Sequence, residues 1–540
     1  MSQFDTQLQA LSGATARQTL RGILRGVEKE SLRVSPDGRL AQTSHPAGLG
    51  SAFSHPHITT DYSEALLEFI TEPQTSIGAL LGQLDDVHRY TYGQLGDEYL
   101  WPASMPCVLG ADSDIPVARY GSSNSGTMKT VYRLGLGHRY GRAMQTIAGV
   151  HYNFSLPDDF WHELARTSGS QLSLQAFKTD RYFALIRNFR RYFWLLVYLF
   201  GAAPAVCRSF VRGREHALEP FGEDDHTLHT PNATSLRMGD LGYQSDAQQS
   251  LVVCYNNLDT YLQTLCGAIT QPHTEYQKIG LKSSAGDYQQ LNTSLLQIEN
   301  EFYSTIRPKR TAKPGQTALQ ALQLGGVEYV EVRCVDLNPF EPLGVSESQL
   351  HYLDAFLLFC LLQDSPEATD QEYQGLQDNQ ARIVYRGRDP ELTLCRNGGE
   401  VKMREWAREI QQQVERCAAL LDQANGGSHY RNACAEQQQK LAGERDTPAA
   451  QVLSELAEGN QTYYAHTLKL AKQHRDYFAA RPLEPQQQAH FTRLAEQSRQ
   501  HQAEVEAADR ESFDDYLAKY YAQYTRCGGA PFATSAQSGC

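Results

Sequence analysis

Residues 21–34 read RGILRGVEKESLRV, and this stretch decides the fold because it predicts a strand that carries charge inside the protein. Residues i and i+2 of a strand share a face, so Glu28 and Glu30 project together. Two such carboxylates repel each other unless a cation lies between them, and oxygen ligands of this kind suit Mg²⁺ or Mn²⁺. The alternative is a solvated strand face.

A second acidic segment is TTDYSEALLEFIT, residues 59–71. On a strand Glu64 and Glu68 share one face, whereas on a helix Asp61 joins them. In both cases the acids stand beside apolar residues that favour burial. A solvated helical face is the alternative here.

The third segment is GGVEYVEVRCVDLNP, residues 325–339. Its strand pattern places Glu331 and Arg333 on one face and valines on the other. The two charged groups form either an internal ion pair or a metal ligand beside a phosphate-binding guanidinium.

The fourth segment, residues 144–155, places Gln145, His151 and Asn153 on one face of a predicted strand, and Arg133 precedes it on the chain. A single histidine of this kind is more often hydrogen-bonded in a core than bound to a metal. Acids from three segments, together with arginines, nevertheless indicate a Mg–ATP phosphoryl-transfer site. The substrate is not identified by this pattern.

These segments define an α+β protein. Strands are expected at Arg21–Val34, Glu64–Thr71, Met144–Ser155 and Gly326–Asp336, and helices at Phe177–Phe200 and Leu350–Gln363. From about residue 400 to Tyr524 the spacing is helical. We expect residues 1–526 to form a single catalytic unit and residues 527–540 to form a flexible tail.

Composition narrows the range of partners. Among 540 residues, Lys+Arg 49 against Asp+Glu 62 gives a net charge of −13, which argues against nucleic-acid or anionic-membrane partners. The most apolar run, Tyr192–Cys207, is shorter than the roughly 20 residues of a spanning helix, and it predicts a buried helix that ends near Gly201. The first residues contain no secretory signal, and eleven cysteines without C-x-x-C spacing fit a reducing cytosol, so we expect a cytoplasmic protein.

The same segments resemble the glutamate–cysteine ligase family of the bacterial monofunctional type. The matching stretches lie in family order between about Arg21 and Gly344. They are RGVEKESLRV, HITTDYSEALLEFIT, WPASMPC, YGSSNSG, RYGRAMQTIAGVHYNFSLP, YLFGAAPAVC, ATSLRMGDLGY, LQIENEFYSTIRPKR and GGVEYVEVRCVDLNPF.

The resemblance implies a glutamine-synthetase-like curved antiparallel sheet that forms the active-site funnel, surrounded by helices. It also implies a reaction in which ATP phosphorylates the γ-carboxylate of L-glutamate and the amine of L-cysteine attacks the acyl phosphate. The products are γ-glutamylcysteine, ADP and phosphate, the first step of glutathione biosynthesis. Mg²⁺, with Mn²⁺ as an alternative, is the expected metal, ATP is the co-substrate, and the expected state is a monomer.

The resemblance also implies residue roles. Arg333 and Arg133 resemble the catalytic arginines. The residues that resemble metal ligands are Glu28, Glu30, Asp61, Glu68, Glu331 and His151, and those that resemble the substrate-binding wall are Tyr62, Tyr132, Leu136, Gln145, Arg237, Tyr243 and Tyr303. Two alternatives remain: a ligase of the same fold that joins glutamate to another amine, and a non-catalytic regulator that binds nucleotide or metal.

Overall fold

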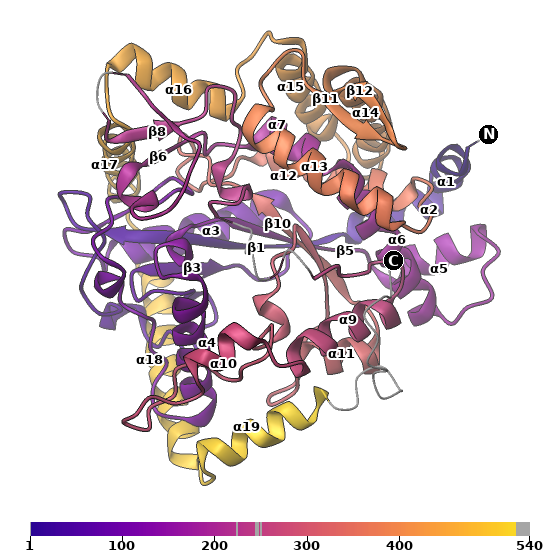
Figure 1. Ribbon diagram of the computed structural model, residues 1–540. Helices are drawn as coiled ribbons and strands as arrows, with labels where there is room; N and C mark the ends of the chain where they lie inside the picture. The colour runs from indigo at the N-terminus through magenta and orange to yellow at the C-terminus, as the bar shows by residue number, and fades with distance from the viewer. Residues whose placement is uncertain (1, 223–224, 243–247, 249–250, 525–540) are drawn as a thin grey trace.

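A central antiparallel sheet organises the protein (Figure 1). The computed structural model describes residues 2–222, 225–242, 248 and 251–524. Within these residues the strand order is β2-β3-β1-β5-β10-β9, and β4 pairs with β1. The strands of this sheet are β1 (Leu24–Val34), β2 (Ile58–Thr60), β3 (Leu66–Ile70), β4 (Tyr99–Leu100), β5 (Val150–Ser155), β9 (Ile306–Lys309) and β10 (Tyr329–Val335).

The four strands that the sequence predicts are confirmed and lie side by side as β3, β1, β5 and β10. One boundary was wrong. Met144–Thr146 forms a short 3-10 helix, and β5 begins only at Val150. Local backbone bonds close this turn, with Gln145 N donating to Arg142 O at 3.1 Å, so Gln145 does not share a strand with His151.

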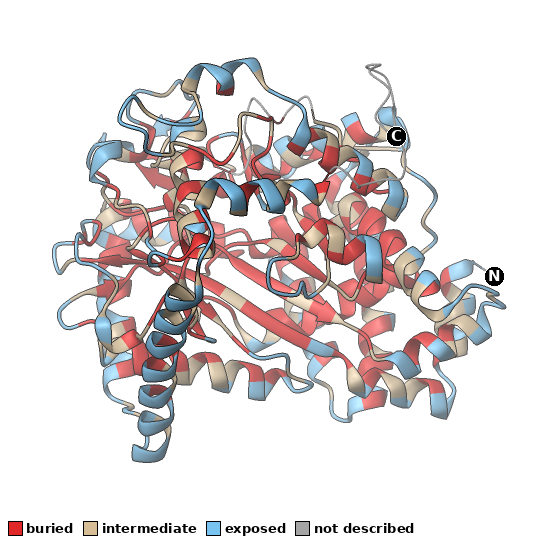
Figure 2. Cartoon of the chain, turned by 90° about the horizontal axis from the view of Figure 1, so that it is seen from below, coloured by how far each residue is buried: buried red, intermediate tan, exposed pale blue. Residues whose placement is uncertain are grey.

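The two faces of β1 have different surroundings. Lys29 points toward α3 (Ile77–Tyr92), where its Nζ lies 2.7 Å from His88 Nε2, while Arg25 points toward α12 (Glu347–Leu362). Because side chains alternate along a strand, Glu28 and Glu30 occupy the opposite face. Figure 2 shows that the sheet is buried along most of its length. Glu30 is buried, and Glu28 is partly exposed, with 21% of its side chain accessible.

Helices lie on both sides of the sheet (Figure 1). Besides α3 and α12, the helices of the first 400 residues are α1 (Gln3–Leu11), α2 (Ala14–Thr19), α4 (Asn124–Tyr140), α5 (Asp158–Thr167), α6 (Leu174–Tyr192), α7 (Trp194–Phe200), α9 (Leu258–Thr270), α10 (Thr274–Ile279), α11 (Ala318–Gly325) and α13 (Asp370–Arg386). The run that the sequence predicts as a buried helix is α7, which is buried throughout and ends before Gly201. Among the described helices, none has both the length and the apolar character that crossing a membrane requires.

The helical C-terminal portion is confirmed and packs back onto the body. It consists of α14 (Met403–Asn425), α15 (His429–Ala442), α16 (Pro448–Gly459), α17 (Tyr463–Ala479), α18 (Pro485–Ala508) and α19 (Phe513–Ala522). Helix α17 contacts α3, and α19 contacts α4. The predicted α+β class is therefore confirmed, whereas the predicted tail, residues 527–540, lies outside the described residues.

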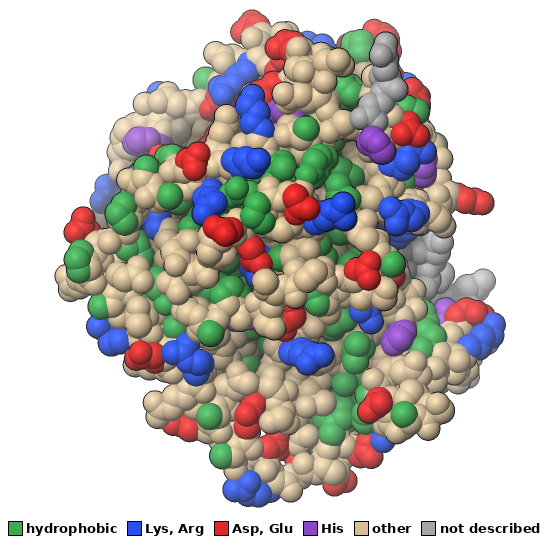
Figure 3. Space-filling view, turned by 90° about the vertical axis from the view of Figure 1, so that its left-hand side faces the viewer, with side chains coloured by type: hydrophobic (Ala, Val, Ile, Leu, Met, Phe, Trp, Pro, Cys, Tyr) green, Lys and Arg blue, Asp and Glu red, His purple; other side chains and the backbone are tan. Residues whose placement is uncertain are grey.

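Two small strand groups complete the described fold. The group β6-β8-β7 contains β6 (Ala205–Cys207), β7 (Glu219–Pro220) and β8 (Thr227–His229), and a hairpin joins β11 (Thr393–Arg396) to β12 (Gly399–Lys402). On the face that Figure 3 shows, acidic and basic side chains are interspersed. That face therefore presents no extended field of one sign.

A buried ion pair joins the sheet to the helices behind it. Arg25 Nε donates to Asp354 Oδ2 at 2.7 Å, and both side chains are almost fully buried. The hydroxyls of Tyr152 and Tyr430 also donate to Asp354, at 2.7 and 3.2 Å. One carboxylate thus connects β1, β5, α12 and α15.

Replacing Asp354 with Ala should lower the free energy of unfolding by about 3–5 kcal/mol, because it leaves a buried guanidinium without its counter-charge. Denaturant unfolding followed by circular dichroism measures this. The matched control is Asp378→Ala, which breaks the exposed Arg382–Asp378 pair on α13 and should cost no more than about 1 kcal/mol. Equal losses in the two variants would contradict the structural role of Asp354.

Candidate active site

The predicted acids come together on the face of the sheet opposite to Lys29 and Arg25. Glu30 is directly opposite Glu68 in the β1–β3 register, and Glu28 is directly opposite His151 in the β1–β5 register. Glu331 occupies the next strand along, β10, where it faces Asn153. Directly opposed residues on neighbouring strands have side chains within contact distance, so the pairing alone assembles the cluster.

His151 lies at the centre of this acid cluster. Its Nδ1 lies 3.3 Å from Glu28 Oε2 and 4.0 Å from Glu331 Oε1, and its Nε2 lies 3.7 Å from Glu30 Oε1. Two sets of three ligand atoms lie within 4.8 Å of one another, one formed by Glu28, His151 and Glu331 and the other by Glu30, Glu68 and His151. The geometry thus groups the side chains around two adjoining positions.

Asp61 enters the cluster from a turn and not from a strand or a helix. It lies between β2 and β3, where its backbone N donates to Leu66 O at 3.0 Å. Glu64, in the same turn, points elsewhere: its carboxylate accepts from the backbone N of His45 and of Arg119, each at 2.8 Å. The expectation that Glu64 shares a face with Glu68 on a strand, or with Asp61 and Glu68 on a helix, is therefore wrong, because Asp61 and Glu64 lie in the turn before β3.

Like charges dominate one side of the cluster. Burial raises the pKa of Glu68 well above its usual range, and the negative charges of Glu28 and Asp61 raise that pKa further. Burial also raises the pKa of Glu30, to which Asp61 adds repulsion. Carboxylates arranged in this way are stabilised by a bound cation.

The other side of the cluster is balanced by basic groups. Lys309 Nζ lies 3.3 Å from Glu331 Oε1, and Arg333 NH1 lies 3.1 Å from Glu331 Oε2. Burial alone would raise the pKa of Glu331, but these two cations hold the pKa well below its usual range. These cations therefore favour the charged form of Glu331, which stands at the border between the acidic and the basic groups.

Sequence reasoning missed Lys309. It stands in the stretch IRPKR, but its nearness to Glu331 follows only from the pairing of β9 with β10, in which Tyr329 faces Lys309. That pairing joins strands separated by a helix, α11. The available signal was the run of basic residues in this stretch, Arg307, Lys309 and Arg310.

The two predicted arginines occupy different places. Arg333 extends over the cluster, with its NH1 3.4 Å from His151 Nδ1. Arg133 projects from α4, donates through Nε to the backbone O of Asp61, and lies over the Tyr120 ring at 4.5 Å. Arg133 thus connects α4 to the turn that carries Asp61.

Several of the predicted substrate-wall residues contact one another or the strand that carries the cluster. Gln145 Nε2 donates to the Tyr303 hydroxyl at 3.2 Å, and Arg237 NH2 donates to Arg333 O at 2.9 Å. Burial raises the pKa of Tyr132 well above its usual range, and the nearby Glu301 and Tyr303 contribute to that increase. Tyr132 therefore stands near Tyr303.

Two of the remaining predicted wall residues are buried at α4. Leu136 and Tyr62 are buried, and the Tyr62 hydroxyl lies against Gly137 on α4. Tyr243 lies outside the described residues. Leu136 is thus a buried residue of α4, and Tyr62 packs against that helix.

A cavity of about 430 Å³ opens beside Tyr303. It is lined by aromatic and amide side chains, including Tyr255, Tyr373 and Gln248, and by Thr305. Thr305 O accepts from the backbone N of Arg333 at 2.9 Å, so the cavity borders the strand that carries the cluster. A cavity of this size and lining could hold a small polar molecule.

A buried carboxylate cluster with guanidinium groups at its edge is typical of enzymes that act on nucleotide phosphates with divalent cations. The profile of the glutamate–cysteine ligase family matches residues 8–383. The chain belongs to the glutamate–cysteine ligase family.

Relatives and solved structures agree over nearly the whole chain. A glutamate–cysteine ligase from Alcanivorax borkumensis is 51% identical over 526 residues, covering 96% of this chain and 100% of the relative. One from Saccharophagus degradans is 52% identical over 509 residues, covering 94% and 96%. The crystal structure of the Francisella tularensis glutamate–cysteine ligase in complex with AMP superposes with a TM-score of 0.88 at 36% identity, covering 94% and 99%.

Proposed function

We propose that this protein joins the γ-carboxylate of L-glutamate to the amine of L-cysteine at the expense of ATP, giving γ-glutamylcysteine, ADP and phosphate. Family membership over most of the chain supports this activity. The observation that carries it in the structure is the cluster of carboxylates, one histidine and Arg333 on one face of the sheet. The product begins the synthesis of glutathione.

The reaction takes two steps. One oxygen of the glutamate γ-carboxylate attacks the γ-phosphorus of ATP, ADP departs, and an acyl phosphate remains. The amine of cysteine then attacks the acyl carbon, loses a proton, and the carbon–oxygen bond to phosphate breaks. Positioning and charge stabilisation supply most of the catalysis in such transfers.

The acid cluster fits a hard divalent cation, because its donors are carboxylate oxygens with a single imidazole. The residues that would hold such ions are Glu28, Glu30, Asp61, Glu68, Glu331 and His151. Mg²⁺, or Mn²⁺ in its place, would balance the charge of the ATP phosphates. The raised pKa of Glu68 supports this proposal, since burial and the neighbouring acids Glu28 and Asp61 disfavour its charged form, which a bound cation would stabilise.

The arginines are assigned to the transferred group. Arg333 is held by Glu331 with its guanidinium beside His151, where a planar fork can bind phosphoryl oxygens. Arg133 is tied to the Asp61 backbone and is placed to add positive charge at the other side of the cluster. Both side chains act as fixed charges that need no rearrangement during the transfer.

The cysteine site is assigned to the wall beside Tyr303. Tyr132, Gln145 and Tyr303 supply polar groups for the amino acid, while Leu136 on α4 and Tyr62 packed against α4 are its apolar neighbours. Arg237 joins this wall to the strand of Arg333. Tyr243 belongs to the same proposal on family resemblance.

For the chain as a whole, we assign residues 1–526 to one catalytic unit that acts as a cytoplasmic monomer. The packing of α17 on α3 and of α19 on α4 supports a single unit. ATP as a co-substrate supports the cytoplasmic assignment.

A panel of amines tests the choice of second substrate. With ATP, Mg²⁺ and glutamate fixed, ADP release should show a higher kcat/KM with cysteine than with 2-aminobutyrate, which has a methyl group in place of the thiol. One missing polar contact is worth about tenfold or more in such discrimination. Equal or higher kcat/KM with 2-aminobutyrate would instead favour a ligase for another amine.

A further inference from the structure

We infer that Glu301 is a positioning residue that fixes Tyr132 and Tyr303, on opposite sides of the proposed cysteine site, relative to each other. This inference rests on the proposed function, because it takes Tyr132 and Tyr303 as part of that site. Glu301 ends the short 3-10 helix Glu299–Glu301, two residues before Tyr303. It touches neither the acid cluster nor the 430 Å³ cavity, and no step of the reaction uses it.

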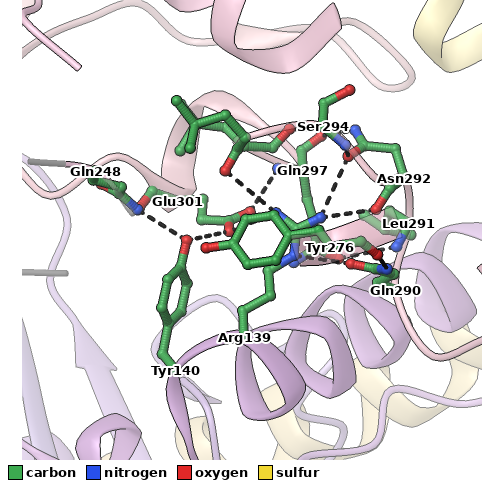
Figure 4. Close-up of polar contacts among 12 residues, drawn as sticks. Arg139, Tyr140, Gln248, Tyr276, Gln290, Leu291, Asn292, Ser294, Gln297 and Glu301 are labelled. Atoms are coloured by element: carbon green, nitrogen blue, oxygen red, sulfur yellow. Dashed lines mark hydrogen bonds and ion pairs between the residues drawn. The ribbon is translucent and has the colours of Figure 1, made fainter. Parts of the chain in front are cut away.

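Glu301 is the centre of a buried polar network, which Figure 4 shows. Its side chain and that of Arg139 are both fully buried, with Arg139 NH1 2.9 Å from Glu301 Oε1. The Tyr140 hydroxyl donates to the same oxygen at 2.7 Å, and the backbone N of Gln297 donates to Oε2 at 2.6 Å. Both carboxylate oxygens are therefore satisfied inside the protein.

Arg139 is fixed just as firmly. Its Nε donates to Gln290 Oε1 at 3.0 Å, its NH2 donates to Asn292 O at 2.8 Å, and its guanidinium lies 4.2 Å from the Tyr276 ring centre. Figure 4 shows Arg139 reaching toward Gln290 and Asn292, whereas Tyr140 reaches toward Glu301 and Gln248. The ion pair thus holds the segment that carries Gln290 and Asn292 against α4.

One arm of the network leads to Tyr303. Gln248 Nε2 donates to the Tyr140 hydroxyl at 3.1 Å and to Glu301 O at 3.0 Å. Gln248 Oε1 accepts from the backbone N of Tyr303 at 3.1 Å. The backbone of Tyr303 is therefore located by the same groups that surround Glu301.

The other arm leads to α4. Tyr132, Leu136 and Tyr140 recur every four residues, so they lie along one face of that helix. Gln297, whose backbone N is held by Glu301, also donates through Nε2 to Tyr132 O at 3.1 Å. One carboxylate therefore fixes both Tyr132 and Tyr303 relative to each other.

Such a network acts on binding geometry. Removing one hydrogen bond from the network should leave the protein folded but allow Tyr132 and Tyr303 to shift relative to each other. Even a sub-ångström shift weakens the binding of a substrate held between them. The expected effect is on cysteine, because Tyr132 and Tyr303 belong to the site proposed for cysteine, whereas the acid cluster and Arg333 are proposed to act on ATP and the transferred phosphoryl group.

Tyr140→Phe is the test variant, since it removes only the hydroxyl that joins Glu301 to Gln248. We expect the KM for cysteine to rise about fivefold to tenfold, while kcat and the KM values for glutamate and ATP stay within about twofold. The matched control is Tyr352→Phe on α12, which removes a buried hydroxyl bond to Gln411 and should leave every KM unchanged. Glu301→Gln should show the same selectivity with a larger rise.

The outcome separates this inference from the proposed function. Tyr303→Phe tests the wall itself, and a rise in the KM for cysteine supports it. If Tyr303→Phe raises that KM while Tyr140→Phe and Glu301→Gln do not, the positioning role of Glu301 is wrong and the cysteine site stands. If Tyr303→Phe has no effect on cysteine, the assigned wall is wrong, and the inference fails with it.

Discussion

Glu331→Gln removes ADP formation almost completely, with a loss in kcat of at least about 10²–10³-fold, while the fold persists. Glu331 is the charged group at the border of the cluster, held within 3.3 Å of Lys309 and 3.1 Å of Arg333. Gln keeps the shape of the side chain but loses the charge and one acceptor. The proposed metal site would then lose one of its carboxylate ligands. Lys309 and Arg333 would lose the carboxylate that orients them.

The measurement is ADP release with glutamate, cysteine and Mg²⁺, with circular dichroism to verify the fold. Glu328→Gln is the matched control, because that carboxylate lies on the same segment and accepts from the backbone N of Thr311 outside the cluster. The control should retain full turnover. Near-normal turnover of Glu331→Gln would defeat the assignment of the cluster.

Arg333→Lys is the second large effect. The substitution keeps the positive charge but loses the planar fork that binds two oxygens at once. We expect kcat to fall about 10²-fold, with little change in the KM for either amino acid, because the contact strengthens as charge develops on the transferred group.

Steady-state kinetics measure this change, and Arg382→Lys on the exposed face of α13 is the control for the loss of a guanidinium. The control should match the parent protein. Kinetic constants within twofold of the parent for Arg333→Lys would mean that Arg333 serves only as the ion-pair partner of Glu331.

Much of the sheet was predictable because its strands carry charge at strand spacing. Glu28 with Glu30, and Glu331 with Arg333, share faces on β1 and β10. The register then opposes Glu30 to Glu68 and Glu28 to His151. Local alternation sets the face of each side chain, and pairing alone brings the faces together.

The errors and omissions have a common physical reason. Spacing could not show that Asp61 and Glu64 lie in a turn, since that turn is fixed by backbone bonds, among them the one from Asp61 N to Leu66 O on β3. Lys309 joins the site through the pairing of β9 with β10, and Glu301 meets Arg139 only by tertiary packing. Such contacts join residues far apart in sequence, and a single sequence does not display them.

The most direct test of the central claim is ADP formation by the purified protein with Mg²⁺, ATP and glutamate, with and without cysteine, followed by mass spectrometry of the product. The proposed function predicts ADP release that depends on cysteine and a product with the mass of γ-glutamylcysteine. ADP release that ignores cysteine, or no ADP under any condition, would contradict it.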